Sequence, residues 1–148
     1  DVESVTSLST GSSSKDFKAY EYETTSVTLL RFKDGRVGKV ASGIDCIQPY
    51  YFHTHLVGSE GSLLDNKLHS SKLGGLDKTR WSELSMKMLD SGDVSDHPYQ
   101  SQFEAFFSAL KKNKPMPLTH ISDALRTHEI LFAADRSAKS GGRTIKVS

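Results

Sequence analysis

The sequence predicts an α+β domain with a mainly antiparallel open sheet and helices on one face. Short β-rich runs separated by turn signals occupy residues 2–67, and a helical period replaces them over residues 103–138. Strands that run together before helices are typical of α+β folds, because parallel βαβ folds alternate the two. No internal repeat is present, so we expect a single domain over residues 1–148.

The first β-rich run covers Val2–Leu8, and a Ser/Gly-rich loop follows at residues 11–15. Val27–Phe32 is β-branched or apolar and predicts a second strand. Asp34-Gly35 predicts a two-residue hairpin turn with positive φ, and Val37–Ile44 is the expected return strand.

Another β-rich run is expected at Tyr50–Val57, followed by a turn at residues 58–61 and a strand at Ser62–Lys67. The Gly-containing segment His69–Lys78 predicts a loop. Trp81–Met88 is consistent with either a strand or a short irregular segment.

The first helix is predicted by one apolar face with spacing i, i+3, i+4 and i+7: Phe103, Phe106, Phe107 and Leu110. Pro98 suits its first turn, where a missing N–H costs little. Asn113 and Pro115 are expected to end it.

The second helix is expected to begin at a cap formed by Thr119 or Ser122 and to end at Gly141-Gly142. Thr144–Val147 is the expected final strand. We expect this helix to bury one stripe: Ile121, Ala124, Leu125, His128, Leu131, Phe132 and Ala138.

Composition excludes several classes of function. The 148 residues carry a formal net charge of +1, which argues against a nucleic-acid-binding surface. No apolar run approaches the ~20 residues that cross a bilayer. Cys46 is the single cysteine, so no intrachain disulfide can form, which is consistent with the cytoplasm.

Two histidines stand out in the predicted Tyr50–Val57 strand. His53 and His55 are two residues apart, so they should point to one face. We interpret them as part of a polar stripe facing a pocket or an interface. A zinc site completed by His69 or Asp45 is the alternative, but zinc needs three or four ligands.

His128 falls within the expected apolar stripe of the second helix. A core histidine satisfied by one hydrogen bond is the default interpretation, and a substrate contact is the alternative.

Three segments in this order carry a family resemblance: VTLLRFKDGRVGKVASG, then HLVGSEGSLLDNK, then FEAFFSALKKNKPMPLTHISDALRTHEILFAADRSAKSGGRTIKV. Together they resemble the carboxy-terminal domain of the Gfo/Idh/MocA oxidoreductases, a family that includes glucose–fructose oxidoreductase and inositol dehydrogenase. The resemblance extends from Val2 to Val147.

The resemblance implies an open sheet that shapes a sugar or polyol pocket and builds a homodimer or higher homo-oligomer. It also implies a parent protein that uses NAD or NADP, held by an amino-terminal Rossmann domain. By the same resemblance, Tyr99 stands where inositol-dehydrogenase-like members have a tyrosine near the substrate. The alternative role of Tyr99 is an aromatic anchor for its helix.

Several family features are missing from the sequence. It contains no G-x-G-x-x-G for a pyrophosphate and no Glu-Lys-Pro, because its one Lys-Pro, Lys114-Pro115, follows Asn113. The helix that carries the family's catalytic histidine has no counterpart either. We therefore expect no catalytic residue, cofactor site or metal site here, and we expect that Asp1 begins a piece of a longer protein or a processed chain.

Two functional hypotheses follow. The first is the substrate-binding and oligomerisation domain of an NAD(P)-dependent oxidoreductase, inactive by itself. The alternative is a non-enzymatic dimeric module that binds a small ligand.

Overall fold

The computed structural model describes residues 1–85, 97, 99–117 and 120–147. They divide into two compact units, one of residues 1–47 and 100–148 and the other of residues 48–99. Each unit contains its own four-stranded antiparallel sheet. The α+β prediction is confirmed, whereas a single domain over 1–148 stays a prediction because it concerns how the two units associate.

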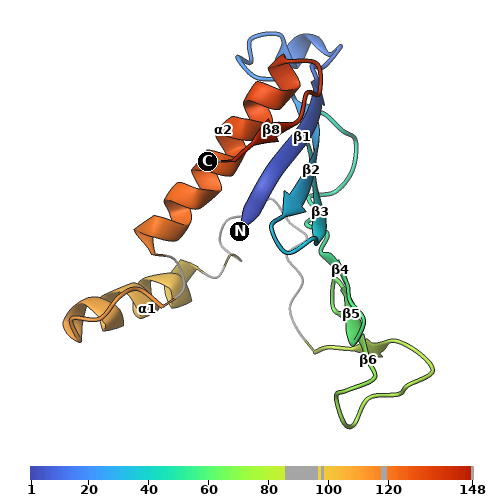
Figure 1. The fold of residues 1–148 in the computed structure, drawn as a ribbon, viewed down its shortest axis with the longest axis vertical. Helices are drawn as coiled ribbons and strands as arrows, with labels where there is room; N and C mark the ends of the chain where they lie inside the picture. The colour runs from blue at the N-terminus through green and yellow to red at the C-terminus, as the bar shows by residue number, and fades with distance from the viewer. Residues whose placement is uncertain (86–96, 98, 118–119, 148) are drawn as a thin grey trace. The chain divides into compact units, whose positions relative to one another are not determined.

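The sheet of the first unit has the strand order β3-β2-β1-β8 (Figure 1). Its strands are β1 (Val2–Thr10), β2 (Thr25–Phe32), β3 (Val37–Gly43) and β8 (Ile145–Lys146). Each matches a predicted strand within a few residues. A 3-10 turn, η1 (Lys15–Phe17), follows the Ser-rich loop.

The β2–β3 hairpin closes differently from the expected two-residue turn. The Phe32 N–H donates to Arg36 O at 2.9 Å, so three residues separate this pair, and the Gly35 N–H donates to Phe32 O at 3.0 Å. Gly35 alone in this turn has a positive φ, 88°. The loop is therefore of the three-residue type that ends in a left-handed glycine.

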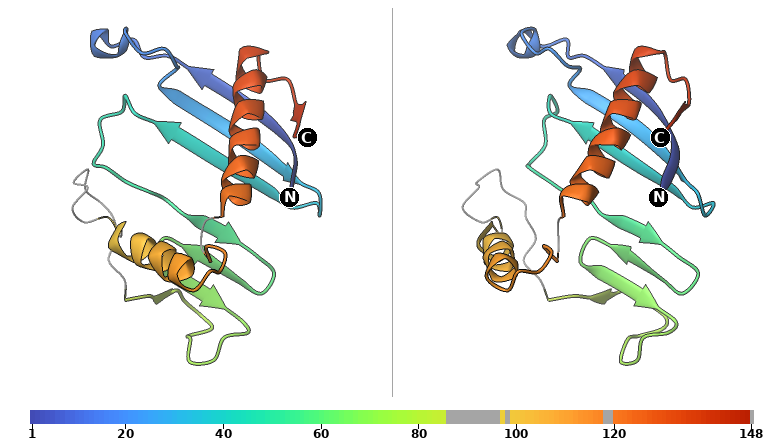
Figure 2. Two further views of the ribbon diagram at one scale, coloured as in Figure 1. Left: turned by 90° about the vertical axis from the view of Figure 1, so that its left-hand side faces the viewer. Right: turned by 60° about the vertical axis from the view of Figure 1, so that its left-hand side comes forward.

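The helix α2 (Ile121–Lys139) lies across one face of this sheet (Figure 2). Val2, Val5 and Ala133 form the buried core, with Ile130 packed against it. The predicted buried stripe is wrong, because Leu125 is 59% and Phe132 61% exposed. The side chains that face the sheet are Ile130 and the small Ala133, Ala134 and Ser137, since a helix that approaches a sheet closely leaves room for few large ones.

Ser137 connects α2 to the sheet through hydrogen bonds. Its hydroxyl accepts from the Ser7 N–H at 2.8 Å and donates to Arg143 O at 2.7 Å. The side chain is fully buried, and its bond with Ser7 is shielded from water. This bond fixes the last turn of α2 against β1.

The ends of α2 partly match expectation. His120 is the N-cap and its side chain accepts from the Ser122 N–H, so Ser122 is not the cap. Thr119 lies outside the described residues. At the other end Gly141 and Gly142 have φ of 70° and 84°, which confirms the predicted glycine stop.

The helix α1 (Tyr99–Lys111) confirms the first predicted helix. Asn113 adopts a φ of 50°, and the Lys114 N–H donates to Ala109 O at 2.9 Å, so the helix ends as predicted. Pro98 lies outside the described residues. The apolar side of α1 is largely exposed: Phe103, Phe106, Phe107 and Leu110.

The sheet of the second unit has the order β4-β5-β6-β7. Its strands are β4 (His55–Val57), β5 (Gly61–Leu64), β6 (Lys67–Ser70) and β7 (Ser82–Glu83). The predicted turn between β4 and β5 is confirmed by a hydrogen bond from the Gly58 N–H to Gly61 O at 2.9 Å.

Three strand predictions in this unit need correction. The run expected from Tyr50 becomes a strand only at His55, and the single strand expected over Ser62–Lys67 is a hairpin turning at Asp65-Asn66. Strand β6 continues through Ser70, into the expected loop. Of Trp81–Met88, residues 82–83 form β7, and residues 86–88 lie outside the described residues.

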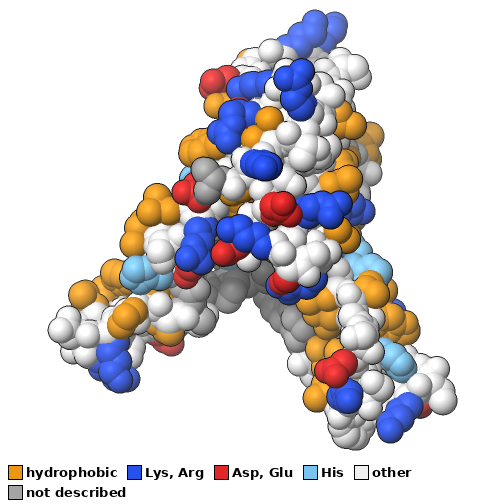
Figure 3. All heavy atoms as spheres, viewed as in Figure 1, with side chains coloured by type: hydrophobic (Ala, Val, Ile, Leu, Met, Phe, Trp, Pro, Cys, Tyr) orange, Lys and Arg blue, Asp and Glu red, His pale blue; other side chains and the backbone are white. Residues whose placement is uncertain are grey.

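On the face seen in Figure 3, blue basic side chains are interspersed with red acidic and orange hydrophobic ones. No helix within the described ranges is both long and apolar enough to cross a membrane.

Candidate functional site

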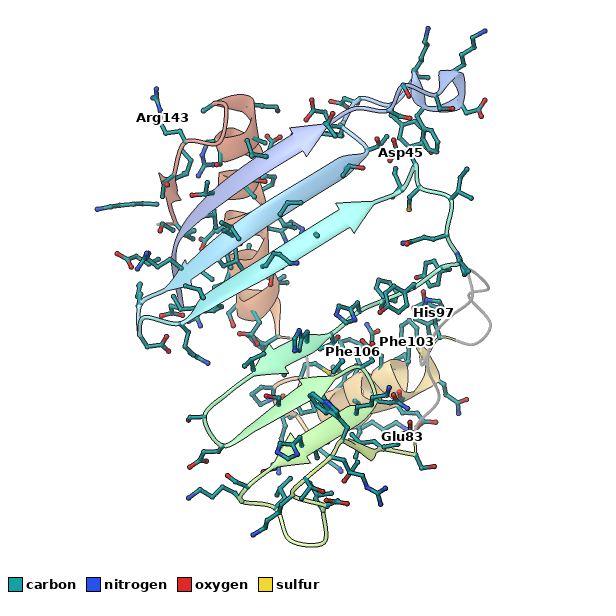
Figure 4. The ribbon with its side chains drawn as sticks, turned by 90° about the vertical axis from the view of Figure 1, so that its right-hand side faces the viewer. Asp45, Glu83, His97, Phe103, Phe106 and Arg143 are labelled. Carbon is teal, nitrogen blue, oxygen red and sulfur yellow. The ribbon has the colours of Figure 1, made fainter. Side chains whose placement is uncertain are left out.

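Ring side chains gather in the second unit, where the segment before β4 meets the residues at the start of α1. The Tyr50 hydroxyl lies 3.4 Å from His97 Nε2, and the Tyr50 ring packs edge-on against Phe52 at 5.1 Å between centroids. His97 stacks on Tyr99 with centroids 5.5 Å apart and planes inclined by 12°. We call Tyr50, Phe52, His97 and Tyr99 the Tyr50 cluster; Figure 4 labels His97.

Tyr99 is the first residue of α1, and its half-exposed ring lies over the imidazole of His97. A tyrosine in this position combines an apolar ring face with a hydroxyl that can donate and accept. Its assignment as a substrate contact stays a prediction. The stacking supports the anchoring role equally, since it ties the helix start to a neighbouring ring.

A second group lies around Asp65. His53 Nδ1 is 2.9 Å from Asp65 Oδ1 and 3.1 Å from Oδ2, and it is 2.8 Å from the Tyr51 hydroxyl. The Tyr51 and His53 rings are stacked at 5.8 Å. We call Tyr51, His53 and Asp65 the Asp65 group.

The carboxylate of Asp65 is held by backbone as well as side-chain contacts. Oδ1 accepts from the Thr54 N–H at 2.9 Å, and the Asp65 N–H donates to Thr54 O at 2.8 Å. The Thr54 hydrogen bond is the largest cause of the lowered pKa of Asp65, and His53 contributes. Partial burial, and then the Asp65 charge, raise the pKa of Tyr51. Asp65 is therefore an ionised acceptor beside a neutral phenol.

Local sequence explains how Asp65 reaches this position. It is the first residue of the β5–β6 turn and has a φ of 53°, a left-handed conformation that Asp tolerates better than most residues. Gly61 is also required here, because a Cβ at this residue would lie 2.7 Å from His69 O. The two strands can therefore approach and aim the turn at Thr54.

His53 and His55 lie side by side, with ring centroids 6.1 Å apart. His53, however, precedes β4 rather than lying in it. Strand register places His55 and His69 on the same face of the sheet, since His55 pairs with Leu64 and His69 with Ser62. Ring side chains are drawn over these strands in Figure 4.

The zinc alternative finds no support in the described part of the chain, which holds no group of three or more metal-ligating side chains. His69 contacts Trp81 edge-on, and its Nδ1 lies 3.3 Å from Arg80 O. Asp45 belongs to the other unit, where hydroxyls of Ser12, Thr24 and Thr25 lower its pKa.

His128 does not occupy a core position. It is exposed on α2, its Nδ1–H donates to Ala124 O at 2.8 Å, and its ring lies 6.2 Å from that of Phe132. The default interpretation as a core histidine is wrong, because the large side chains of α2 point away from the sheet. A substrate contact by His128 stays a prediction.

The His53–His55 spacing also predicts Tyr51 on the same face, and Tyr51 does contact His53, whereas Asp65 and His97 are not predicted as members of these groups. Asp65 falls in the middle of the expected strand Ser62–Lys67, although Asp-Asn between two apolar pairs is a turn signal. His97 carries no local signal, because its contacts with Tyr50 and Tyr99 depend on tertiary structure.

The described residues do not fit a dinucleotide pyrophosphate. That group needs a glycine-rich turn whose N–H groups point at it from a helix start. Helix α2 begins instead at His120, whose side chain already takes the Ser122 N–H, and α1 begins at Tyr99 without a glycine nearby.

The fold is shared with solved dehydrogenases. The chain is similar to the WlbA dehydrogenase of Bordetella pertussis in complex with NADH and UDP-GlcNAcA, with 21% identity and a TM-score of 0.66 over 99% of this chain and 39% of that one. It is similar to a myo-inositol dehydrogenase of Corynebacterium glutamicum, with 14% identity and a TM-score of 0.73 over 100% of this chain and 44% of that one. It is also similar to an oxidoreductase of Agrobacterium radiobacter in complex with NAD+, L-tartaric acid and magnesium. The identity is 20% and the TM-score is 0.72, over 99% of this chain and 44% of that one.

No model of a known protein family matches the sequence, and neither does any curated protein. At these identities the structural likeness shows a shared fold. The resemblance to the carboxy-terminal domain of the Gfo/Idh/MocA oxidoreductases is confirmed at that level. The chain spans 39–44% of the length of these three solved chains.

Proposed function

We propose that this chain is the substrate-binding and oligomerisation domain of an NAD(P)-dependent oxidoreductase that acts on a sugar, a polyol or a related hydroxylated compound. The observation that carries the proposal is the extent of the fold match. Nearly the whole chain superimposes on less than half of each dehydrogenase, two of which hold NADH or NAD+.

The chemistry of the second unit supports a hydroxylated ligand. The Tyr50 cluster and the Asp65 group place phenol hydroxyls and imidazole nitrogens beside ring faces. Sugars and polyols present both hydroxyls and C–H surfaces, which such rings match. We assign substrate contacts to Tyr99, His53 and His55. His128 is retained with less support, because its Nδ1 is engaged by its own helix.

The proposal places the dinucleotide, NAD or NADP, on a separate domain. The matched dehydrogenases are more than twice as long as this chain, and the described helix starts do not suit a pyrophosphate. The proposal also assigns the protein to the cytoplasm. In that compartment the single exposed thiol of Cys46 would stay reduced.

The oligomer is assigned to the face of the β3-β2-β1-β8 sheet opposite α2. Strand register places exposed Leu8, Val27 and Leu29 together on that face. Apolar side chains collected on an open sheet favour burial against a second copy.

One observation favours the alternative of a non-enzymatic dimeric module. Both ring groups are complete within residues 48–99 and need no cofactor for their contacts. A ligand could therefore bind without redox chemistry.

Calorimetry with NADH and NADPH tests the main proposal. We expect no binding in the micromolar range to this chain, because the pyrophosphate site is assigned elsewhere. Clear micromolar binding would contradict that assignment. Polyol-dependent formation of NADH by the full-length protein would support the oxidoreductase over the non-enzymatic module.

Tyr99→Phe provides the residue-level version of this test. We expect KM for the polyol to rise about tenfold, which corresponds to ~1.4 kcal/mol. Tyr20→Phe, at an exposed tyrosine of the other unit, is the matched control and should leave KM unchanged. An unchanged KM in Tyr99→Phe would leave Tyr99 as a structural anchor.

A further inference from the structure

The contact between Asp65 and His53 fixes the orientation of one imidazole. Both carboxylate oxygens of Asp65 lie within 3.1 Å of His53 Nδ1. Asp65 is itself tied to Thr54 by two reciprocal hydrogen bonds. Its side chain is 20% exposed, against 44% for His53, so the acceptor is the more sheltered partner.

This geometry selects a tautomer of His53. An ionised carboxylate can only accept, so the hydrogen in the Asp65–His53 contact must come from Nδ1. The Tyr51 oxygen lies 2.8 Å from the same Nδ1, so it can accept from that N–H while its own hydrogen is directed at Asp65 Oδ2, 3.4 Å away. In the neutral imidazole, Nε2 then carries a lone pair, and no hydrogen bond from a described residue engages it.

We propose that Asp65 and His53 form an acid–base dyad in which Asp65 positions His53 to accept, through Nε2, a hydrogen bond from a hydroxyl of the ligand. The inference rests on the proposed function for the class of ligand, and it adds Asp65 as a positioning residue.

The surroundings of the dyad suit a neutral hydroxylated ligand. Tyr51 stacks on one side of His53, and His55 lies 6.1 Å away between ring centroids. Among the residues that the structure describes, the titratable groups with a contact to His53 are Tyr51, His55 and Asp65. On the same sheet face, the row from His55 continues through Lys67 and Glu83, whose charges are opposite. No single charge sign dominates, so hydroxyls rather than phosphates or carboxylates match this surface.

Asp65→Asn is the decisive substitution. Asn tolerates the left-handed φ of the turn and can still accept from Thr54, so the turn should be retained. Its amide would donate to Nδ1 and move the ring hydrogen to Nε2, which converts the acceptor into a donor. Nitrogen-15 NMR of the histidine rings should show His53 with Nδ1–H in the original chain and with Nε2–H in this variant.

Binding is measured in the same samples with myo-inositol as the probe, by following the His53 ring signals. We expect Asp65→Asn to weaken binding at least about tenfold. Asp77→Asn is the control, because Asp77 is also fixed by a backbone N–H in the same unit but contacts Thr79 and Arg80. It should change neither the His53 tautomer nor the affinity.

The outcomes separate the two proposals. An Nε2–H tautomer in the original chain, or no change in Asp65→Asn, would overturn the dyad whatever the ligand. A changed tautomer with unchanged affinity would overturn its role in binding. Failure of myo-inositol and of other polyols to bind at millimolar concentration would count against the proposed function and the ligand role together, while the tautomer still decides whether the dyad exists.

Discussion

Asp34 shows how one residue responds to its turn. Its carboxylate receives hydrogen bonds from the Arg36 backbone at 3.2 Å and from the Arg36 guanidinium at 2.7 Å and longer. The side-chain hydrogen bond from Arg36 is the main reason that the pKa of Asp34 is lowered from 3.8 to about 2. A lowered carboxyl pKa stabilises the fold above the unfolded value and loses that contribution as the pH falls.

We expect Arg36→Ala to raise the pKa of Asp34 from about 2 toward 3.8. The wild-type contribution to stability should be complete above pH 3.8 and should disappear as the pH falls toward 2. Carbon-13 NMR titration of the Asp34 carboxyl measures the shift directly. Arg31→Ala is the control, because Arg31 lies in β2 and donates no hydrogen bond to Asp34 within the described part of the chain. It should leave the pKa of Asp34 unchanged. A carboxyl that still titrates near 2 without Arg36 would contradict this cause.

The Asp65 group marks the limit of residue-level prediction. His53 was identified because histidines are conspicuous in a β-rich run. Its partner Asp65 was not, because the sequence pattern was interpreted as one strand from Ser62 to Lys67. The pairing depends on a turn between two strands of only four residues each, and periodicity over so short a distance does not separate one strand from two.

At the scale of the element, α2 carries the clearest error. Large apolar residues at helical spacing were expected to face the sheet, but the sheet side is formed by Ile130, Ala133, Ala134 and Ser137. These also follow i, i+3, i+4 and i+7. The sequence thus contained two stripes, and hydrophobicity favoured the larger one. Close packing on β1 selected the stripe in which three of the four residues are small, and the helical spacing alone does not distinguish it from the larger one.

Two substitutions in α2 compare these stripes. Ile130→Ala should lower the free energy of unfolding by about 2 kcal/mol, because it removes apolar groups packed against the core cluster that contains Val2 and Val5. Leu125→Ala should change it by less than about 0.5 kcal/mol, since its side chain is exposed. Urea unfolding followed by circular dichroism measures both. A larger loss at Leu125 would mean that the predicted stripe is the buried one.

The remaining elements were predictable where a local signal was strong. Asp34-Gly35 located a hairpin, Asn113 and Gly141-Gly142 ended their helices, and the aromatic spacing defined α1. The type of hairpin loop was not predictable in the same way. It follows from pairing of Phe32 with Arg36, which the dipeptide does not specify.

At the scale of the whole molecule, the order of strands and helices was sufficient for the fold class. It did not reveal that the strands divide into two sheets. Strands β1 to β3 and β4 to β6 follow one another with similar turns, so the sequence offers no marker at Gln48, where the second unit begins. Division depends on which edges remain unpaired, and pairing across distant residues such as Val5 and Ile145 is not visible in local patterns.

The first unit presents two apolar surfaces that compete as the site of self-association. One is the open sheet face with Leu29, 55% exposed, and the other is the outer side of α2 with Leu125. A sheet face is broad and flat, so it can bury the ~1,200–2,000 Å² that a stable interface needs more readily than one helix can. We therefore expect the dimer to form through the sheet.

Leu29→Arg and Leu125→Arg distinguish the two surfaces. The sheet variant would place unpaired charges in the interface, and we expect its dimer dissociation constant to rise at least about 100-fold, or ~2.7 kcal/mol. The helix variant has a matched residue type and similar exposure in the same unit, so it should remain dimeric. Sedimentation velocity over a concentration series measures both, and circular dichroism checks that each variant is folded. If the Leu125→Arg variant dissociates instead, the dimer interface lies on α2. If the unsubstituted chain is a monomer at high concentration, the proposed dimer does not form.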